Sequence, residues 1–518
     1  MIRPRSAVAG MVLVALLSAC GGGGSPSAGE LITAPDPDVL VSQDRNPVIA
    51  RNSPVLVVNP LQRTNMVIVD RVDRPDYSAG VHLTNDGGLN WREAPLKPPA
   101  GVQGKLFAPS AAFDGRGVLY VSYVILTGTG NDPDSYWLAR SGDGGLNFEE
   151  PTRIAGQHTY QTSLAVAPRS GRLYASWLQS NLEATTCLLC FAQTGLPIVV
   201  SRSDDGGRTW SAPVQVSDAG RARVGAPALA VDPDGNPAVL YVDYAGDRWD
   251  WENLPGHYDG TFSLVVTRSA TRGATWTPGE VVDDGIVPTG RFLVYLPVTP
   301  GFTIASNGDM YAVWADARAG DPDVFLRRST DNGKTWGKPV QVNRGTAGDG
   351  VPQDMPSVGV APGGRVDVVY YDRTIDRRGS KADVLLSSSS DSGKSFSRTI
   401  RLSDAPSDRK IGPQGSPHLE EADFGSRTSV ASLAGGAIAA WTDTRNGTLD
   451  GGKQDIFTGQ IALDDNSSLA LANVALAGAG ILLGVAGVTL FLLSRRRAKS
   501  APAAAEPADT RLRRGEGT

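Results

Sequence analysis

The sequence predicts an all-β protein folded as a seven-bladed β-propeller, followed by one C-terminal transmembrane helix. Three observations lead to this fold class: a short motif recurs along the chain, each repeat holds four strand-like segments, and the repeat length divides the central region into seven units. A single sheet of this kind buries its apolar faces by stacking against its neighbours, and closing the ring removes exposed sheet edges.

An eight-residue motif, which we call the box, recurs six times with starts 57, 62, 66, 60 and 60 residues apart. The regular copies are TNDGGLNW, SGDGGLNF, SDDGGRTW, STDNGKTW and SSDSGKSF, with aspartates Asp86, Asp143, Asp205, Asp331 and Asp391; the sixth copy has Thr271 instead. Asp accepts hydrogen bonds from turn amides, Gly allows positive φ, and the aromatic ring packs between sheets. The box therefore predicts a repeated hairpin corner with a structural role.

Between boxes each repeat contains four strands, A to D. In one repeat we expect them at Pro356–Val360, Val366–Asp372, Asp383–Ser389 and Phe396–Leu402. Seven B strands can be identified, at Met66–Arg71, Val118–Tyr123, Arg172–Trp177, Ala238–Asp243, Met310–Asp316, Val366–Asp372 and Ala437–Asp443. One seventh of the region 38–461 is about 61 residues, which equals the mean box spacing and favours seven blades over six.

The last repeat has no D strand and no box, because its C strand at Asp455–Ile461 leads toward the C-terminus. Asp38–Ser42 (DVLVS) resembles the D strands Val214–Ser217 (VQVS) and Val340–Asn343 (VQVN). We therefore expect this N-terminal strand to complete blade 7, so that the propeller spans residues 38–462.

The N-terminus has the features of an export signal. Residues 1–20 contain two arginines and an apolar run, and they end in Leu-Ser-Ala-Cys, which resembles a bacterial lipobox. We expect lipidation of Cys20, with ordinary signal cleavage as the alternative. The Gly/Ser/Pro-rich residues 21–37 are predicted to form a flexible linker.

The other end of the chain predicts a membrane anchor. Residues 469–493 carry no charge, and a helix of that length spans a hydrocarbon core of about 30 Å. Basic residues follow directly, so the tail 494–518 is expected to be cytoplasmic and disordered, with the bulk of the chain extracytoplasmic at the cell membrane.

Composition excludes several functions. A formal net charge of −5 argues against a nucleic-acid partner. Four His and three Cys supply too few ligands for a transition-metal site, and no metal or cofactor is predicted. Cys187 and Cys190 have no further ligands near them in sequence, so a local disulfide is the preferred interpretation in an exported protein.

The strand order places the A–B turns and the boxes on one face, and the long B–C and D–A loops on the other, which we call the loop face. Loops of this kind usually carry function. B strands end in repeated Asp/Arg pairs near the loop face, and the candidate ligand-binding members are Asp316, Arg318, Asp372, Arg373, Asp443 and Arg445. Either each Asp pairs with its nearby Arg as scaffold, or some of the arginines bind a carboxylate or sugar hydroxyls.

Two loops add further candidates. The B–C loop of blade 4 contains Trp249, Trp251 and Tyr258, whose aromatic faces suit sugar rings; a loop that packs on its own aromatics is the alternative. The D–A loop Ser403–Arg427 contains His418, Glu420, Glu421 and Asp423. Paired carboxylates could serve acid/base chemistry there, although a solvated acidic loop is the simpler interpretation.

The boxes resemble the Asp-box (bacterial neuraminidase, BNR) repeat of sialidases and other propellers, over about 80% of the chain. In sialidases an arginine triad holds the sialic acid carboxylate, a Tyr activated by Glu is the nucleophile, and an Asp is the acid/base. The resemblance makes Arg51, in Arg-Asn-Ser-Pro, a match to the first triad arginine. With the adjacent Asp70 and Arg71, it is a candidate catalytic residue.

The sequence also departs from the sialidase pattern. Ala108 stands where the acid/base Asp is expected, and no Tyr with a partner Glu is evident near Arg427-Thr428-Ser429-Val430. Sialidases also have six blades. We therefore predict a membrane-anchored propeller that recognises a glycan or cell-envelope ligand on its loop face. The alternatives are a glycoside hydrolase, sialidase-like or acting on another polysaccharide, and a protein-interaction scaffold.

Overall fold

The computed structural model describes residues 31–180, 196–221, 223–244, 260–288, 298–377, 379–413 and 421–463. The predicted signal, Cys20, the apolar segment 469–493 and the tail lie outside these ranges. No helix in the described ranges is both long and apolar enough to cross a membrane.

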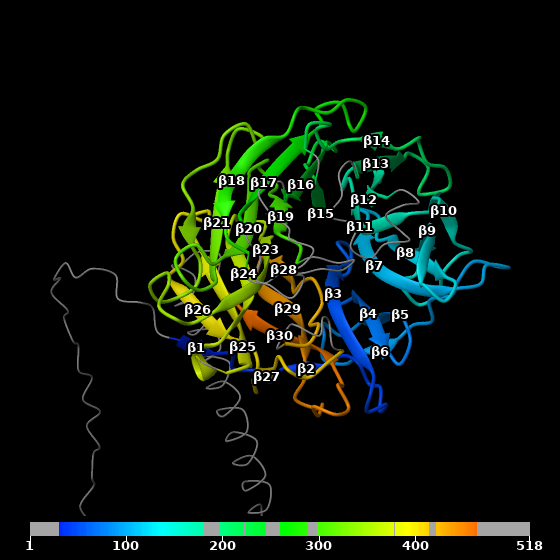
Figure 1. The fold of residues 1–518 in the computed structure, drawn as a ribbon. Helices are drawn as coiled ribbons and strands as arrows, with labels where there is room; N and C mark the ends of the chain where they lie inside the picture. Colours follow the sequence, from blue (N-terminus) through cyan, green and yellow to red (C-terminus); the bar gives the residue numbers. More distant parts are fainter. Residues whose placement is uncertain are drawn as a thin grey trace, which may run out of the picture.

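Seven sheets are arranged in a ring, which confirms the predicted propeller and its blade number (Figure 1). Blade 1 contains β3 (Ala50–Val58), β4 (Met66–Arg74), β5 (Ser78–Thr84) and β6 (Arg92–Glu93). Blade 2 contains β7 (Lys105–Phe113), β8 (Leu119–Thr127), β9 (Asp132–Ser141) and β10 (Thr152–Ala155). Blade 3 contains β11 (Thr159–Val166), β12 (Leu173–Gln179), β13 (Ile198–Ser203) and β14 (Val214–Gln215).

The remaining blades follow the same order. Blade 4 contains β15 (Val224–Val231), β16 (Pro237–Asp243), β17 (Phe262–Arg268) and β18 (Glu280–Ile286). Blade 5 contains β19 (Gly301–Ile304), β20 (Met310–Asp316), β21 (Asp323–Ser329) and β22 (Val340–Gln341). Blade 6 contains β23 (Gln353–Val360), β24 (Val366–Asp372), β25 (Lys381–Ser389) and β26 (Arg398–Arg401), with β1 (Leu31–Thr33) and β27 (Ser407–Asp408) added. Blade 7 contains β28 (Ser429–Leu433), β29 (Gly436–Asp443), β30 (Asp455–Ala462) and β2 (Val39–Leu40).

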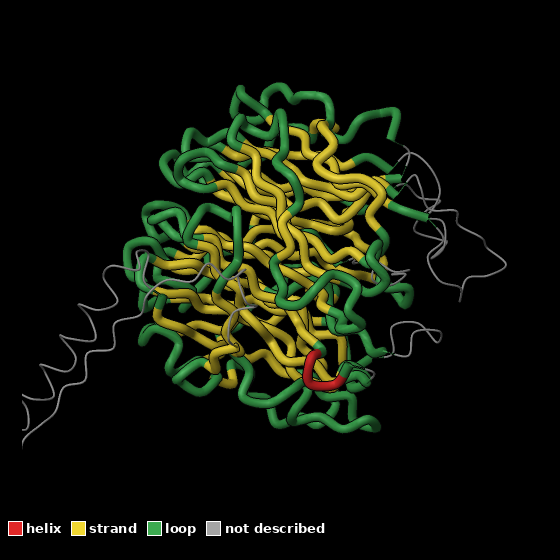
Figure 2. The backbone as a smooth tube through the Cα atoms, turned by 90° about the vertical axis from the view of Figure 1, so that its left-hand side faces the viewer, coloured by secondary structure: helices red, strands yellow, loops and turns green. Residues whose placement is uncertain are grey.

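The core lies between adjacent blades. Every residue of the B strands β16, β24 and β29 is buried, because both faces of a blade pack against neighbouring blades. Tyr136 of blade 2 meets Trp177 of blade 3 edge-on, with ring centroids 6.1 Å apart. Strands therefore form the body and loops its rims, and a short 3-10 helix, Thr374–Asp376, follows β24 (Figure 2).

The box geometry agrees with its predicted structural role. In blade 3, the Oγ of Ser203 donates to Asp205 Oδ1 at 2.8 Å and accepts from the amide of Gly207 at 2.9 Å. Asp205 also accepts from the amide and the hydroxyl of Thr209, and such hydrogen bonds lower the pKa of this carboxyl to about 2. Its hydrogen-bonding capacity is therefore used within the corner.

The N-terminal strand closes the ring. In β2, Val39 pairs with Thr458 and Leu40 with Phe457 of β30, as the sequence predicted. Ser42 Oγ then accepts from the amide of Ile456 at 3.0 Å. In other blades the residue that follows the D strand also accepts a hydrogen bond from a backbone amide of the C strand, which explains the VxVS/VxVN resemblance. The side-chain oxygens of Ser217, Asn343 and Ser403 accept from the amides of Ile198, Val324 and Val384.

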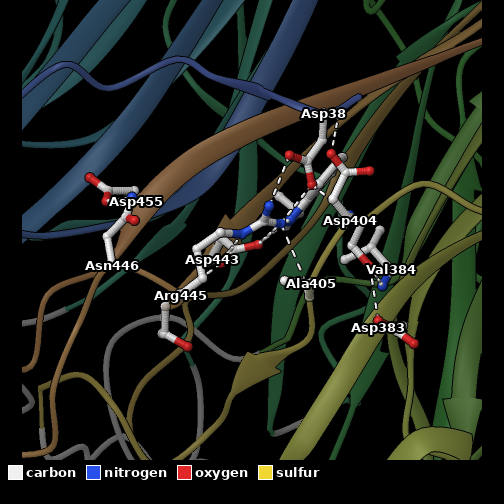
Figure 3. A network of polar contacts seen from close by, with 12 residues as sticks. Asp38, Asp383, Val384, Asp404, Ala405, Asp443, Arg445, Asn446 and Asp455 are labelled. Atoms are coloured by element: carbon white, nitrogen blue, oxygen red, sulfur yellow. Dashed lines mark hydrogen bonds and ion pairs between the residues drawn. The ribbon is translucent and has the colours of Figure 1, made fainter. Parts of the chain in front are cut away.

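An ion-pair cluster, which we call the closure clasp, joins the two ends (Figure 3). Arg445 donates from Nη1 and Nη2 to both oxygens of Asp38, at 2.9 and 2.6 Å, and from Nε and Nη2 to Asp443, at 3.1 and 2.7 Å. Its guanidinium also lies 4.2 Å from the ring centroid of Phe457. Both carboxylates are buried, so the clasp is a desolvated bidentate pair between residues 407 positions apart.

We expect Arg445→Met to destabilise the full chain by about 3–5 kcal/mol, because it leaves the buried carboxylates of Asp38 and Asp443 without their counter-charge. Urea unfolding measures the loss, and limited proteolysis measures release of the N-terminal strand. Arg318→Met is the matched control: Arg318 also pairs with the Asp two residues before it, but it does not join the chain ends. If limited proteolysis releases the N-terminal strand no faster in Arg445→Met than in the control, the clasp does not hold the chain ends together.

Candidate functional site

The A strands form the inner ring of the propeller, and a repeated bulge shapes their loop-face ends. Five residues in this bulge have positive φ: Ser53 (55°), Ala108 (47°), Gln161 (52°), Ala226 (52°) and Met355 (51°). The register of the A strand shifts at each of these positions. Such backbone costs on the order of 1–3 kcal/mol per residue and tends to occur at functional sites, so its repetition singles out the axis.

The bulge, which the described strands show in blades 1, 2, 3, 4 and 6, marks a position that can be aligned by sequence in all seven blades. The residue after it is Pro in blades 1, 2, 4, 5 and 6 and Thr in blades 3 and 7. Thr162 and Thr428 each donate to the bulge carbonyl of the preceding blade, Ala108 and Met355, at 3.3 and 2.9 Å. The seven equivalent residues, which we call the axial ring, are Ser53, Ala108, Gln161, Ala226, Thr299, Met355 and Arg427. Six are uncharged, and blade 7 alone contributes a cation.

A pocket of about 160 Å³ lies on the axis, lined by the A strands of blades 3 to 7. Its lining includes the hydroxyls of Thr162, Ser163, Ser357 and Thr428, together with Arg427. Hydroxyls both donate and accept hydrogen bonds, so the wall can bind a polyhydroxylated ligand in several orientations.

The guanidinium of Arg427 is not neutralised. Its Nε is buried without a hydrogen-bond partner among the described residues. Burial, together with the nearby charge of Arg71, lowers the pKa of Arg427 to about 10, and no carboxylate in the described part of the chain opposes the shift. An arginine held in this way favours an incoming anion.

Arg71 lies beside Arg427, but the charge of Arg71 is balanced by two carboxylates. Its Nη2 contacts Asp73 Oδ2 at 2.6 Å and Asp423 Oδ2 at 2.8 Å, and its guanidinium lies 5.7 Å from the ring centroid of Phe107. Although burial opposes the charge, these carboxylates raise the pKa of Arg71. Asp73 and Asp423 are therefore bound by Arg71, and neither forms an ion pair with Arg427.

The carboxyl of Asp73 has a raised pKa. Burial and the neighbouring Asp423 raise the pKa of Asp73, while Arg71 acts in the opposite direction. Its Oδ1 is buried and has no hydrogen-bond partner in the described ranges. Burial and the charge of Asp73 raise the pKa of Tyr77, which is the opposite of what a phenolate nucleophile requires.

The D–A loop that leads to Arg427 is held by a second charged cluster. Glu421 accepts from Arg373 Nη1 at 2.6 Å and lies 3.6 Å from Arg409 Nε, and both arginines also contact Asp354. Arg409 lies 4.5 Å from the ring centroid of Phe424. Although burial disfavours its charge, the two arginines lower the pKa of Glu421, so the loop is pinned by an ionised pair at neutral pH.

The predicted catalytic candidates are separated in the structure. Arg51 extends along blade 1, away from the axial pocket, and pairs with Asp70 at 3.1 Å and Glu93 at 3.2 Å. Asp70 is fully buried and lies 2.7 Å from His82 Nε2. Of the three candidates, Arg71 alone comes close to Arg427.

The predicted Asp/Arg pairs divide into two kinds. Arg318 and Arg445 bind the Asp two residues before them, Asp316 and Asp443, as in the scaffold interpretation. Arg373 instead reaches Glu421, while Asp372 accepts from Gln353 Nε2 at 3.2 Å. All three arginines have carboxylate partners, so their binding to a ligand stays a prediction.

Other candidates lie outside the described residues: Trp249, Trp251, Tyr258, His418, Glu420, Cys187 and Cys190. The sequence analysis did not select Arg427, Asp73 or Tyr77. Alignment of the seven A strands on their Pro or Thr would have singled out Arg427, because arginine stands there in one repeat among small or uncharged residues. Asp73 and Tyr77 have no comparable signal, since Asp73 depends on Arg71 and the nearby Asp423, and Tyr77 packs on Phe107 of blade 2.

No protein-family model matches the chain. A sialidase of Bacteroides fragilis (strain YCH46) is 27% identical over 158 residues, which cover 28% of this chain and 29% of that protein. The match therefore spans less than a third of the relative's length.

Solved structures with a similar fold include three that act on glycans by their titles. The Hadza microbial sialidase Hz136 has a TM-score of 0.42 at 14% identity and covers 78% of this chain and 75% of its own. A polysaccharide lyase, PL25 ulvan lyase, has a TM-score of 0.46 at 10% sequence identity, and the match covers 81% of this chain and 96% of the lyase. The α-L-arabinofuranosidase Arb93A from Fusarium graminearum has a TM-score of 0.42 at 15% identity, and the match covers 71% of this chain and 96% of that enzyme.

We expect Arg427→Met to stabilise the full chain by about 1–3 kcal/mol, because it removes a desolvated charge that has no partner in the free protein. Equilibrium urea unfolding at pH 7 measures this change. Arg63→Met, an exposed arginine in the A–B turn of blade 1, is the control and should leave stability within about 0.5 kcal/mol. A loss of stability in Arg427→Met would show that Arg427 is a structural residue.

Proposed function

We propose that this chain, a sialidase-like β-propeller, binds a glycan that carries a carboxylate or sulfate, with the anionic group on Arg427 in the axial pocket. The observation that carries the proposal is the unneutralised guanidinium of Arg427 on a hydroxyl-lined wall. A planar guanidinium binds a carboxylate or sulfate through paired hydrogen bonds. The partial likeness to a Bacteroides fragilis sialidase supports a glycan as the ligand class.

The cost of the site supports a binding role. A partly buried guanidinium without a counter-charge among the described residues destabilises the free protein, and such a feature persists where a ligand interaction requires it. The chemistry of the wall also fits: Phe302 offers an apolar ring, and the surrounding hydroxyls offer hydrogen-bond partners to a sugar.

The location proposed for this activity is the outer side of the cell membrane. The export signal, Cys20 and the apolar segment 469–493 support it at the level of sequence. An envelope or extracellular polysaccharide with uronic or sialic acid units would be accessible to a loop-face pocket there.

Binding to the full chain in detergent tests the proposal. We expect oligogalacturonate or sialyllactose, measured by calorimetry at pH 7, to bind wild type and to lose at least about tenfold in affinity in Arg427→Met, which corresponds to 1.4 kcal/mol. Neutral lactose should bind weakly to both. Affinity for the acidic sugar should hold up to about pH 9 and fall as pH rises through 10, where Arg427 loses its proton.

Two results would contradict the proposal. Equal affinity of the wild type and Arg427→Met for acidic sugars would remove the anion site. The absence of any sugar binding would favour a protein-interaction scaffold. Arg63→Met, an exposed arginine on the box face, is the control and should leave the affinity unchanged.

A second candidate function is glycosidic bond cleavage with Asp73 as proton donor. The observation in its favour is the raised pKa of Asp73, together with its Oδ1, which has no hydrogen-bond partner among the described residues. A carboxyl with a raised pKa keeps its proton over a wider pH range and can donate it to a leaving-group oxygen. The raised pKa of Tyr77 argues against it as a covalent nucleophile.

We expect Asp73→Asn to keep binding of the acidic sugar and to lower any turnover of an acidic polysaccharide by at least about 10²-fold, because the amide cannot act as a general acid. Release of reducing ends from the full chain at pH 5 to 7 measures turnover. Asp423→Asn is the matched control, because Asp423 pairs with Arg71 as Asp73 does. Turnover that survives in Asp73→Asn would exclude this role, and absent turnover in wild type would leave binding as the function.

A further inference from the structure

The C-terminal end of the propeller leaves on the box face. β30 ends where Ala462 pairs with Gly436, beside the A–B turn of blade 7. The amide of Leu463 then donates to Gly435 O at 3.1 Å, and Arg365 Nη1 donates to Leu463 O at 3.1 Å. The exit point is therefore held at the end of the ring opposite the loop face.

The N-terminal end enters on the same face. β1 runs parallel to β26, and Leu31 pairs with Thr399 near the start of that strand, directly after the box of blade 6. The chain then rises along blade 6 and crosses to β2 on blade 7 (Figure 1). Both segments outside the propeller, each with a predicted membrane attachment, thus join it at the box face.

The box face carries an unusual set of exposed leucines. Leu61 is 70% exposed, Leu89 61% and Leu146 38%. Leu89 and Leu146 occupy the sixth box position in blades 1 and 2. In the later boxes this position is Arg208, Ala274, Lys334 and Lys394.

These leucines lie in one sector. Leu61, in the A–B turn of blade 1, approaches Gly117 in the A–B turn of blade 2. Asn65, which lies in the A–B turn of blade 1 like Leu61, donates from Nδ2 to Gly144 O in the box that contains Leu146. Gly88, in the box that contains Leu89, lies against Ile438 of β29 in blade 7. The apolar sector therefore runs from blade 2 through blade 1 to blade 7, where the chain exits.

We infer that this sector of the box face rests on a lipid bilayer, with Leu61, Leu89 and Leu146 inserted at its interface. Residues 464–468 span at most about 18 Å when fully extended, which keeps the exit point on the box face close to the predicted membrane segment 469–493. Exposed leucines beside a membrane anchor gain by leaving water. The axial pocket then faces away from the membrane, and this orientation does not depend on which ligand the pocket binds.

Cysteine labelling of the full chain tests the orientation. Gln62→Cys places a thiol beside Leu61, and Leu449→Cys places one on the loop face, where Leu449 is 68% exposed. The probe is a charged maleimide, and labelling of the unsubstituted chain is subtracted. In phosphatidylethanolamine/phosphatidylglycerol vesicles we expect Gln62→Cys to react at least about fivefold more slowly than in detergent, and Leu449→Cys to react equally in both.

A leucine variant separates insertion from tethering. Replacing Leu61, Leu89 and Leu146 together with Gln should reduce the protection of Gln62→Cys to less than about twofold, with vesicle association retained. Leu449→Gln is the control and should leave protection unchanged. Unaltered urea unfolding of the triple variant, whose substitutions are on the surface, shows that the fold is intact.

The results that overturn the inference are distinct. Equal labelling of Gln62→Cys in vesicles and in detergent would show that the box face is not on the bilayer. If Gln62→Cys reacts slowly in vesicles and equally slowly in detergent, while Leu449→Cys reacts fast in both, a protein partner or a second copy covers this surface. Full protection in the triple variant would show that the leucines are not inserted.

Discussion

Pairing of β2 with β30 is the contact on which the rest of the molecule depends. It supplies the outer strand that blade 7 lacks, and it covers the edge of β30 that an incomplete blade would expose. The closure clasp adds a desolvated ion pair across the same seam. Blades 1 and 7 can then adjoin, as the hydrogen bond from Ser426 N to Ser53 Oγ illustrates across 373 positions of sequence.

Closure also determines the electrostatics of the axis. Each blade contributes one residue to the axial ring, and four of these residues, Gln161, Ala226, Thr299 and Arg427, line the axial pocket. Arg427 breaks the near-uniform pattern with a charge. No carboxylate among the described residues offsets this charge, and Asp73 and Asp423 are bound to Arg71 instead. A scaffold with repeating geometry has in this way acquired a single asymmetric binding group.

The sequence pattern located charged residues near the loop face but could not assign their partners. Asp-x-Arg looks the same in blades 5 and 7, yet Arg318 pairs within its own loop and with Asp283, whereas Arg445 reaches Asp38 from the other end of the chain. Arg51 matched a motif of the resembled family because the Pro in that motif marks the bulge, which recurs in most blades for structural reasons. Its side chain is used by Asp70 and Glu93.

Sequence alone could predict the number of blades, the strand order and the partner of the N-terminal strand. These features depend on local turn chemistry and on a motif that recurs six times along the chain. Ser42 could even be recognised by its likeness to Ser217, since both satisfy the same backbone amide. Which arginine is left without a counter-charge was decided by the tertiary structure. That outcome depends on competition among carboxylates brought together from blades 1, 6 and 7, and burial strengthens each contact by an amount that no linear spacing encodes.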